Sequence, residues 1–304
     1  MLNRRRFLTI SAASLAMASP VRSGAAGVYT WSGIALGARA TIRIAHPDAA
    51  AICARAAAEI DRLEDVFSLY RVDSALMRLN AAGQIDAPPP ELLECLTIAG
   101  AVHRATGGLF DPTVQPLWAL WAERSVAGGR PAAEDLAAVR AIGGWSDLRL
   151  DAAQVAVLPG MALTLNGIAQ GYIADRVATL LEAEGLSDVL IDTGEFRAIG
   201  GHPEGGDWPV RLAEGGAVNL RSRALATSAP LGTVFDAEGQ AGHILDPRAG
   251  LPAAAKWRAV SISAPSAALA DALSTAACMA SDVDEIAGWL SRFEDARCEA
   301  AVPV

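Results

Sequence analysis

One junction between a strand and a helix in this chain reads Leu165-Asn166-Gly167-Ile168-Ala169-Gln170-Gly171-Tyr172-Ile173-Ala174-Asp175. Upstream of it the hydrophobic pattern predicts mainly helices, and downstream it predicts mainly short strands separated by glycine-rich turns. The two glycines let a ligand approach the main chain, and free N–H groups at a helix start favour an anion such as a phosphate. An ordinary strand-to-helix turn has the same pattern, so this stretch alone does not distinguish a binding site from a connection.

The periodicity of the whole chain predicts an α+β fold, with a mixed β-sheet core and flanking helices. It shows no regular βαβ alternation and no internal repeat, which argues against a doubly wound parallel fold. The loops at 87–90 and 125–131 are too short to be clear linkers, so we expect residues 28–304 to form one domain. We expect helices at 47–66, 92–106, 114–123, 133–142, 172–184 and 267–279, and strands at 38–45, 148–158, 162–165, 189–192, 208–212, 217–220 and 258–263.

Residues 1–27 differ in composition from the rest of the 304-residue chain, of which 52% is apolar. Arg4-Arg5-Arg6 precedes a run rich in alanine, serine and leucine, which is typical of a twin-arginine export signal. This run is too short to span a bilayer, for which about 20 residues are needed. An uncleaved interfacial anchor is the alternative. We expect a soluble periplasmic protein that is exported by the twin-arginine route.

Charge and cysteine usage exclude several classes of partner and site. Removal of residues 1–27 would leave 21 basic and 34 acidic residues, a net charge of −13, which argues against nucleic acid as a partner. No cysteine precedes Cys53, so the export segment offers no site for a lipid anchor. Cys53, Cys95, Cys278 and Cys298 form no C-x-x-C pair, which argues against a zinc or thioredoxin-like site. Their spacing leaves a Cys278–Cys298 disulfide open.

The loop Gly242-His243-Ile244-Leu245-Asp246-Pro247-Arg248-Ala249-Gly250 gathers a histidine, an aspartate and an arginine between turn-forming residues. Pro247 fixes its own backbone and restricts that of Asp246, while the two glycines permit sharp reversals. The pattern fits a reactive loop that presents three polar side chains. It also fits a surface turn with one salt bridge.

Asp271 and Thr275 are four residues apart in the largely apolar segment 269–279, which puts both on one face of a helix. A carboxylate in such a setting needs a partner, and the two side chains offer hard oxygen ligands of the kind that Mg²⁺ binds. Helix capping by Ser266 or Asp271 is the alternative, but capping explains only the aspartate.

Three further segments carry side chains that could contact a ligand. Glu195 follows a strand, either on the rim of a site or in a hairpin turn. Phe110 and Trp118 could lie beside an aromatic ligand, with core packing as the alternative for Trp118. Tyr70 is either a stacking platform or a half-buried core tyrosine. The chain lacks G-x-S-x-G, H-E-x-x-H and Walker sequences, which argues against serine hydrolases, zinc proteases and P-loop enzymes.

Taken together and in order, these motifs resemble those of the ApbE family of FAD-dependent protein flavin transferases. The resemblance rests on Gly33 to Gly37, SLYRVDS at Ser68, FDPTVQPLWALW at Phe110, LNGIAQGYIAD at Leu165, DTGEFRAIG at Asp192, ATS at Ala226, GHILDPRAG at Gly242 and ADALSTA at Ala270. It implies an ApbE-like fold and Mg²⁺-dependent transfer of FMN from FAD to a threonine of a target flavoprotein, with release of AMP.

The resemblance also implies a role for each matching residue. The Ala169 carbonyl, Asp271 and Thr275 would hold Mg²⁺ beside the FAD pyrophosphate. His243 would take the proton from the incoming threonine hydroxyl, and Arg248 would share the neutralisation of charge with Mg²⁺. The FAD-binding residues would be Tyr70 against the flavin ring and, along the rest of the dinucleotide, Asp111, Thr113, Gly167, Gln170, Glu195, Ser228 and His243.

The chain departs from the family pattern at three places. Gln170 stands where a lysine is usual, Ala229 replaces a glycine, and the acidic turn at 192–195 replaces an L-G-G-D pattern. The variant with Asn166 and Gln170 is similar to a NosX-like branch linked to nitrous oxide respiration, which implies a membrane-bound flavoprotein as the acceptor. Two alternatives remain: a Mg²⁺-dependent FAD pyrophosphatase, in which water replaces threonine, and a non-catalytic periplasmic FAD-binding carrier.

Overall fold

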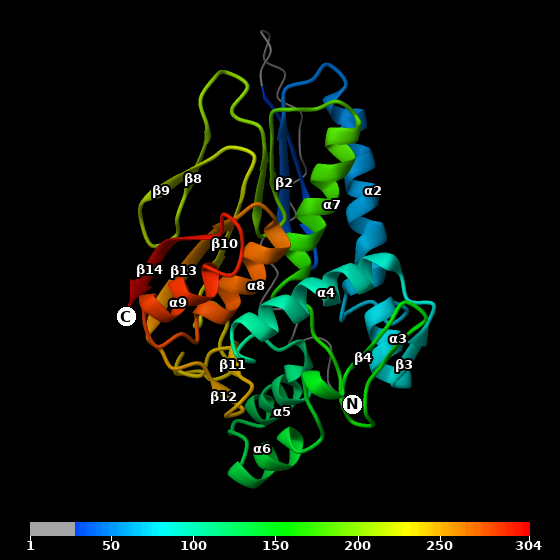
Figure 1. Ribbon diagram of the computed structural model, residues 1–304, viewed down its shortest axis with the longest axis vertical. Coiled ribbons are helices and arrows are strands. Elements are labelled where there is room, and N and C mark those ends of the chain that lie inside the picture. Colours follow the sequence, from blue (N-terminus) through cyan, green and yellow to red (C-terminus); the bar gives the residue numbers. More distant parts are fainter. Residues whose placement is uncertain (1–27) are drawn as a thin grey trace.

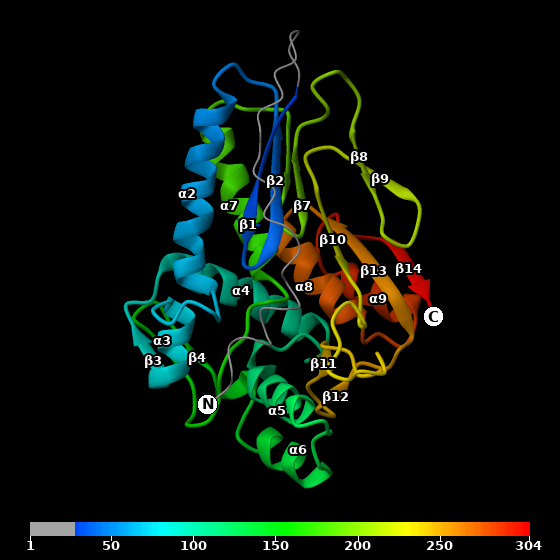
Figure 2. The ribbon, with the colours of Figure 1, turned by 180° about the vertical axis from the view of Figure 1, so that it is seen from behind.

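The computed structural model describes residues 28–304, and the predicted export signal at 1–27 lies outside the described residues. A seven-stranded sheet runs through the molecule, and long helices cover one of its faces (Figure 1 and Figure 2). The strand order is β1 (Tyr29–Ala35), β2 (Ala38–Ile44), β6 (Val189–Asp192), β7 (Phe196–Ile199), β10 (Ala224–Ser228), β13 (Trp257–Ala264) and β14 (Arg297–Pro303). The predicted α+β class is confirmed.

The pairing within this sheet differs from the expected mixture of directions. Every pair of neighbouring strands in it is antiparallel. Tight turns join β1 to β2 and β6 to β7, and a turn of two to five residues can only join antiparallel strands. The prediction of a mixed sheet was therefore wrong in this respect, because the glycine-rich turns signal hairpins and not parallel crossovers.

The helices on the sheet are α2 (Ala49–Phe67), α7 (Ala169–Ala183) and α8 (Ala267–Ala277), with α4 (Pro90–Ala105) lying across their ends (Figure 1). Ile52, Ala56, Ile60 and Leu63 recur at helical spacing in α2 and are all buried, so they form the stripe that packs inward. The core is thus formed mainly between this helical layer and the sheet.

A small hairpin of β8 (Trp208–Arg211) and β9 (Ala217–Leu220) covers part of the opposite face of the sheet. In β6, Leu190 packs in the hydrophobic cluster of this hairpin, whereas Val189 and Ile191 pack in the main core with the helices. The alternation follows from the period of two along a strand.

Apart from α9 (Val283–Leu290), which packs against β14, the remaining elements lie below α4 in the view of Figure 2. The strands β11 and β12 form a two-stranded sheet near α5 (Figure 2), and β3, β5 and β4 form a three-stranded sheet beside α3. The bounds are α3 (Ala75–Ala82), β3 (Gln84–Asp86), η1 (Pro112–Val114), α5 (Gln115–Val126), α6 (Ala133–Arg140), η2 (Trp145–Asp147), β4 (Arg149–Leu150), β5 (Gln154–Ala156), β11 (Leu245–Asp246), β12 (Leu251–Pro252) and α9 (Val283–Leu290).

Two predicted strands are wrong for identifiable reasons. The segment 162–165 is irregular, because the Asn80 side chain satisfies the backbone of Leu163 through both its oxygen (2.7 Å) and its nitrogen (2.8 Å). The segment 148–158 is split into β4 and β5, because the Asp151 carboxylate accepts hydrogen bonds from the N–H groups of Ala153 and Gln154 and makes a turn.

All four cysteines are free, with Cys278 buried and Cys298 exposed, so the disulfide that their spacing left open is not formed. Within residues 28–304, no helix combines the length and the apolar character needed to cross a bilayer.

Candidate functional site

A cavity of about 390 Å³ lies where the start of α7, one face of α8, the end of β10 and the loop 242–250 meet. Phe110 and Trp118 both line it, as expected for an aromatic ligand. The cavity brings together most of the site residues that the sequence predicted, namely Asp111, Gly167, Gln170, Glu195, Ser228, His243, Asp271 and Thr275. Residues from segments more than 150 positions apart in the sequence therefore share one site.

Four predicted residues lie outside the lining of this cavity. Tyr70 is 68% exposed in the loop after α2, and Ala169 is buried at the first position of α7. Thr113 donates its hydroxyl and N–H to the Asp111 carboxylate (2.7 and 2.8 Å) and lines a neighbouring cavity. The Arg248 guanidinium is bound to its own loop. Their predicted contacts with FAD or Mg²⁺ remain predictions.

The helices α7 and α8 are linked by two carboxylates. Each helix provides one carboxylate, which accepts hydrogen bonds from backbone N–H groups at the start of the other helix. Asp175 of α7 accepts hydrogen bonds from the N–H groups of Ala267 (2.9 Å) and Ala268 (3.0 Å) at the start of α8. In return, Asp271 of α8 accepts one from the Gly171 N–H (3.2 Å) at the start of α7. Each carboxylate satisfies backbone donors that a helix start leaves free. We call this arrangement the α7–α8 clamp.

Glycine at position 171 is required by the closeness of the two helices. A β-carbon there would lie 2.2 Å from the Ala267 carbonyl oxygen, which is far inside contact distance. Ser266 adds to the clamp, since its hydroxyl donates to Asp175 (2.7 Å) and accepts from the Leu269 N–H (3.3 Å). Capping by Ser266 is therefore confirmed, whereas Asp271 caps the neighbouring helix and not its own.

Asp271 and Glu195 place two buried carboxyl groups on the cavity, 3% and 7% exposed. Burial raises the pKa of Asp271, and burial together with the nearby Asp271 charge raises the pKa of Glu195. The Glu195 carboxylate accepts one hydrogen bond, from the Thr227 N–H (3.1 Å). Among residues 28–304, neither carboxylate forms an ion pair with an arginine, lysine or histidine. Buried carboxylates without a cationic partner are costly, which favours a bound cation.

The donor set around Asp271 fits Mg²⁺ better than a soft metal. Thr275 lies one turn further along α8 and also faces the cavity, and its hydroxyl is 3.4 Å from that of Ser228. A β-carbon on Gly167 would lie 2.9 Å from the Thr275 hydroxyl, so a larger residue at position 167 would crowd this donor. Within the described residues, no group of three or more histidine, cysteine or acidic side chains is placed to bind a metal. Carboxylate and hydroxyl oxygens suit a hard cation that keeps several waters.

Gln170 makes the cavity poor in positive charge. Its side chain lies against the turn after β6, where a β-carbon on Gly194 would be 2.8 Å from the amide nitrogen. Thr193 donates its hydroxyl to the Gln170 carbonyl (2.8 Å), which fixes the turn to the start of α7. No lysine or arginine belongs to the lining of the cavity in the part of the chain that the structure describes. An anionic ligand would therefore depend on a metal ion and on backbone N–H groups.

His243 lines the same cavity from the loop 242–250. Its Nδ1 is 3.1 Å from the Thr233 carbonyl oxygen, and a carbonyl only accepts, so Nδ1 carries the proton. In this tautomer Nε2 carries the lone pair that can accept a proton. The Pro230 carbonyl also interacts with the ring and favours its protonated form. Partial burial lowers the pKa of His243, which keeps the imidazole neutral near pH 7. A neutral, oriented imidazole can act as a general base.

Arg248 forms the salt bridge that the sequence left as an alternative for this loop. Its Nε and Nη2 donate to the two oxygens of Asp246 (3.0 and 2.8 Å), and its side chain is 58% exposed. The ion pair lowers the pKa of Asp246. The loop is thus stiffened from within, and His243 reaches the cavity while Arg248 remains at the surface.

Sequence reasoning missed two residues that position the site. The sequence predicted no role for Asp175, although an aspartate in an apolar helix is itself a signal of a buried partner. Thr233 orients His243 through its carbonyl group, which any residue type could provide, so no sequence signal could have found it.

Comparisons with known proteins place this arrangement in a family. The model of the ApbE family matches residues 36–301. A FAD:protein FMN transferase of Klebsiella pneumoniae is 29% identical over 242 residues, which cover 74% of each chain. One from Vibrio cholerae is 31% identical over 240 residues, 71% of each chain.

Solved structures agree with the sequence comparison. The apo flavinyl transferase ApbE of Pseudomonas stutzeri superposes with a TM-score of 0.79 at 27% identity, covering 91% of this chain and 94% of that one. The ApbE protein of Thermotoga maritima gives a TM-score of 0.76 at 26% identity, covering 85% and 89%. Most of the described fold is shared with both. The chain is a member of the ApbE family.

Proposed function

We propose that the protein is a FAD:protein FMN transferase, which moves FMN from FAD to a threonine of an acceptor protein and releases AMP. The observation that carries the proposal is that His243, Asp271 and Thr275 line one cavity. A relative of that name is 29% identical to this chain over 74% of its length, and a flavinyl transferase ApbE shares the fold. FAD is the donor substrate, and its pyrophosphate would lie in this cavity, within reach of His243 and of the cation held by Asp271 and Thr275.

His243 provides the proton acceptor for the reaction. Its Nε2 would take the proton of the threonine hydroxyl while the threonine oxygen bonds to the FMN-side phosphorus. The bond from this phosphorus to the bridging oxygen breaks, and AMP leaves with that oxygen. Phosphoryl transfer needs positioning and charge neutralisation more than covalent catalysis, so one base and one cation are adequate.

Asp271, Thr275 and the Ala169 carbonyl would hold Mg²⁺, which neutralises phosphate charge when bound. The α7–α8 clamp fixes the carboxylate, because one Asp271 oxygen accepts from Gly171 while the other remains available. Among residues 28–304 no lysine or arginine lines the cavity, so a bound metal would carry most of the positive charge there. Arg248 could add to it, because an exposed ion pair holds this side chain only weakly.

The proposal extends to the place of action and to the acceptor. The Arg4-Arg5-Arg6 segment supports export to the periplasm by the twin-arginine route. Gln170 in place of the usual lysine supports the branch linked to nitrous oxide respiration. Its acceptor would be a membrane-bound flavoprotein.

The test is to incubate the purified protein with FAD, Mg²⁺ and a threonine-bearing acceptor domain, and to measure flavin fluorescence of the acceptor in a denaturing gel together with AMP. We expect a fluorescent acceptor and equimolar AMP, both abolished by EDTA or by Asp271→Ala. AMP without a labelled acceptor would indicate a pyrophosphatase, and bound FAD without AMP would indicate a carrier.

A further inference from the structure

Besides its own turns, the loop that carries His243 has a support from outside, helix α5. Trp118, Trp121 and Ser125 recur at helical spacing, so they lie on one face of this helix. All three contact Phe235, which precedes His243 by eight residues. The ring of Trp118 meets that of Phe235 edge-on at 5.5 Å between centroids, and the ring of Trp121 stacks on it at 5.7 Å. The Ser125 hydroxyl donates to the Phe235 carbonyl.

The segments around Phe235 and His243 pair in a short antiparallel ladder. The Phe235 N–H donates to the Ala241 carbonyl (2.7 Å), and the His243 N–H donates to the Thr233 carbonyl (3.0 Å). A β-bridge joins the two residues that lie between these bonds. The Thr233 carbonyl also accepts from the imidazole Nδ1 of His243. The position of the Phe235 ring therefore constrains the position and the orientation of the imidazole.

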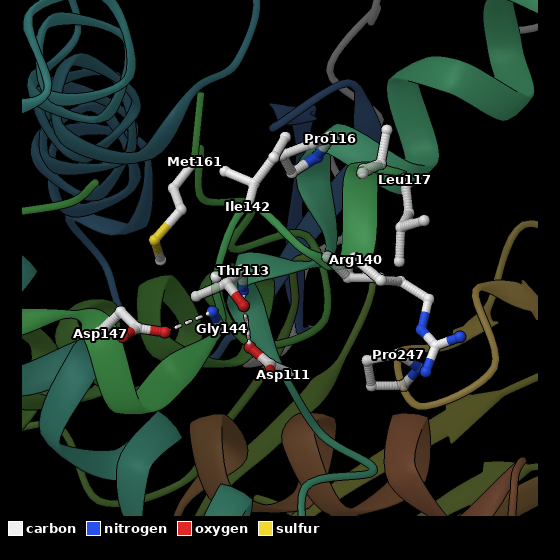
Figure 3. A pocket seen from close by; sticks show the side chains of 13 residues that line it. Asp111, Thr113, Pro116, Leu117, Arg140, Ile142, Gly144, Asp147, Met161 and Pro247 are labelled. Atoms are coloured by element: carbon white, nitrogen blue, oxygen red, sulfur yellow. Dashed lines mark hydrogen bonds between the residues drawn. The ribbon is translucent and has the colours of Figure 1, made fainter. Parts of the chain in front are cut away.

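Trp121 also holds the far end of the loop. Its indole N–H donates to the Gly250 carbonyl (2.9 Å) in a buried hydrogen bond. Gly250 has a φ of +73°, and a β-carbon there would lie 3.2 Å from the Leu117 side chain, so this end of the loop packs directly on α5. Leu117, Arg140 of α6 and Pro247 of the loop line a neighbouring cavity of about 340 Å³ (Figure 3). The loop is thus seated on both helices.

The contact between the loop and these helices has a hydrophobic cluster of its own, separate from the main core. Its buried members are Leu117, Trp121, Leu136, Ala241 and Leu245. Trp121 is the largest of them and is 4% exposed. In the described part of the chain it is not among the residues that line either cavity. A substitution at Trp121 therefore reaches the reaction through the residues that it holds.

We propose that Trp121 is a positioning residue, which holds His243 in the orientation that lets Nε2 take the threonine proton. It acts at two points, through Phe235 on the segment before His243 and through Gly250 at the end of the loop. The proposal rests on the transferase function proposed above. Misplacing a reacting group by about 1 Å can cost about 10²-fold in rate, so a support outside the cavity matters for catalysis.

The test begins with Trp121→Phe, which keeps an aromatic ring beside Phe235 and removes the N–H that binds Gly250. The full-length protein is supplied with FAD, Mg²⁺ and the acceptor, and AMP release is followed. We expect kcat to fall by about tenfold, because a buried hydrogen bond no longer fixes the loop. The dissociation constant of FAD should change less than about twofold, the pattern of a change that acts on the transition state. Amide hydrogen exchange in 241–250 should become faster.

The matched control is Trp257→Phe. Trp257 is also buried, and its indole N–H donates to the Ala280 carbonyl (3.1 Å). It belongs to the main core, however, and lies outside the lining of both cavities in residues 28–304. This variant should lose a similar amount of unfolding free energy, with no change in kcat or in the exchange of 241–250. An equal loss of kcat in the two variants would overturn the proposal, because Trp121 would then act through stability alone.

A double variant decides whether Trp121 acts through His243. In the background of His243→Gln, Trp121→Phe should slow AMP release no further, because the base that it positions is absent. Independent, multiplying losses of rate would overturn the proposal. A weakening of FAD binding that accounts for the whole loss of rate would overturn it as well, since the aromatic residues would then support the dinucleotide.

The outcome is separable from that of the transferase proposal. If the wild type neither labels an acceptor nor releases AMP, the transferase function fails, while the exchange of 241–250 in Trp121→Phe still decides whether Trp121 holds the loop. If the wild type and Trp121→Phe transfer FMN at the same rate, the positioning role fails and the transferase function stands.

Discussion

The helix side of the candidate site, built from the starts of α7 and α8, differs in construction from the loop side at 242–250. On the helix side Asp271 is 3% exposed and Asp175 bonds two backbone N–H groups of the neighbouring helix. On the loop side the Arg248 side chain is 58% exposed, and its partner is two residues away in the sequence. The first side is held by long-range contacts, and the second mainly by its own turns.

The difference matches what each side must do in the proposed reaction. Charges that develop on phosphates are best met by groups that are already fixed before the reaction. An acceptor protein must enter and leave, which favours a more exposed loop on that side. Substitutions on the helix side should therefore affect stability and metal binding together, whereas substitutions on the loop side should affect catalysis with little change in stability.

Asp271→Asn should have the largest effect, with opposite signs on activity and stability. Transfer should fall by about 10³-fold or more, because the cation loses its carboxylate ligand. The unfolding free energy of the metal-free protein should rise, because an ionised carboxylate without a cationic partner is no longer buried. AMP release and urea unfolding in EDTA test the two parts. A destabilised metal-free variant would contradict the proposed role of the buried charge.

His243→Gln should lower kcat by about 10²–10⁴-fold, the usual contribution of a general base. The dissociation constant of FAD and the unfolding free energy should change little. Isothermal titration with FAD and single-turnover AMP release separate binding from chemistry. Loss of FAD binding would show that His243 holds the dinucleotide and does not act as the base.

The pH dependence of the reaction sharpens this test. Because burial lowers the pKa of His243 below 6.5, the rate should fall on the acid side with a midpoint below 6.5. The unfolded chain takes up the proton at a higher pH than the folded protein, so the contribution of His243 to stability is present above pH 6.5 and is lost as the pH falls. A midpoint above 6.5 would contradict the neutral imidazole.

Asp175→Ala should break the α7–α8 clamp without removing any residue from the cavity lining. Losing hydrogen bonds to a carboxylate and the ion pair with Arg197 should cost about 2–3 kcal/mol of unfolding free energy. Mg²⁺ should bind about 10–100-fold more weakly, as for other residues that orient a metal ligand. Ser266→Ala, which removes only the hydroxyl cap, should cost about 1 kcal/mol. Equal metal affinities in wild type and Asp175→Ala would show that the clamp does not position Asp271.

Arg248→Ala should have the smallest effect on stability, less than about 1 kcal/mol, as expected for an exposed ion pair. If the wild-type guanidinium leaves Asp246 to bind a phosphate, transfer by Arg248→Ala should be roughly tenfold slower. Arg248→Lys should partly restore the rate. A rate equal to that of the wild type would assign Arg248 to the loop alone.

The fold was predictable where the sequence period was long. The helices α2, α4, α7 and α8 were expected to within a few residues, because each has an apolar stripe over at least three turns. The strand expected at 162–165 was wrong, because the distant Asn80 satisfies that backbone, and no local pattern reveals such a partner.

The candidate site was predictable as a list of residues but not as an arrangement. Asp271 and Thr275 could be assigned to one helix face from their spacing, and the structure places both on the cavity. Their relation to α7 could not be predicted, because Asp271 bonds Gly171 across 100 residues of sequence. Arg248 was expected to face the phosphates, but the aspartate two positions earlier offers a nearer partner.

The clamp also determines when during synthesis the site can exist. Asp175 and its partners in α8 are 92 and 93 residues apart, so α7 leaves the ribosome long before the amides that its carboxylate will bind. The entropy of closing so long a loop must be overcome before the contact forms, which places it late in folding. A chain that stops short of α8 would lack Asp271 and would leave the start of α7 without its partner. Metal binding would therefore begin only after nearly the whole polypeptide has been synthesised and folded.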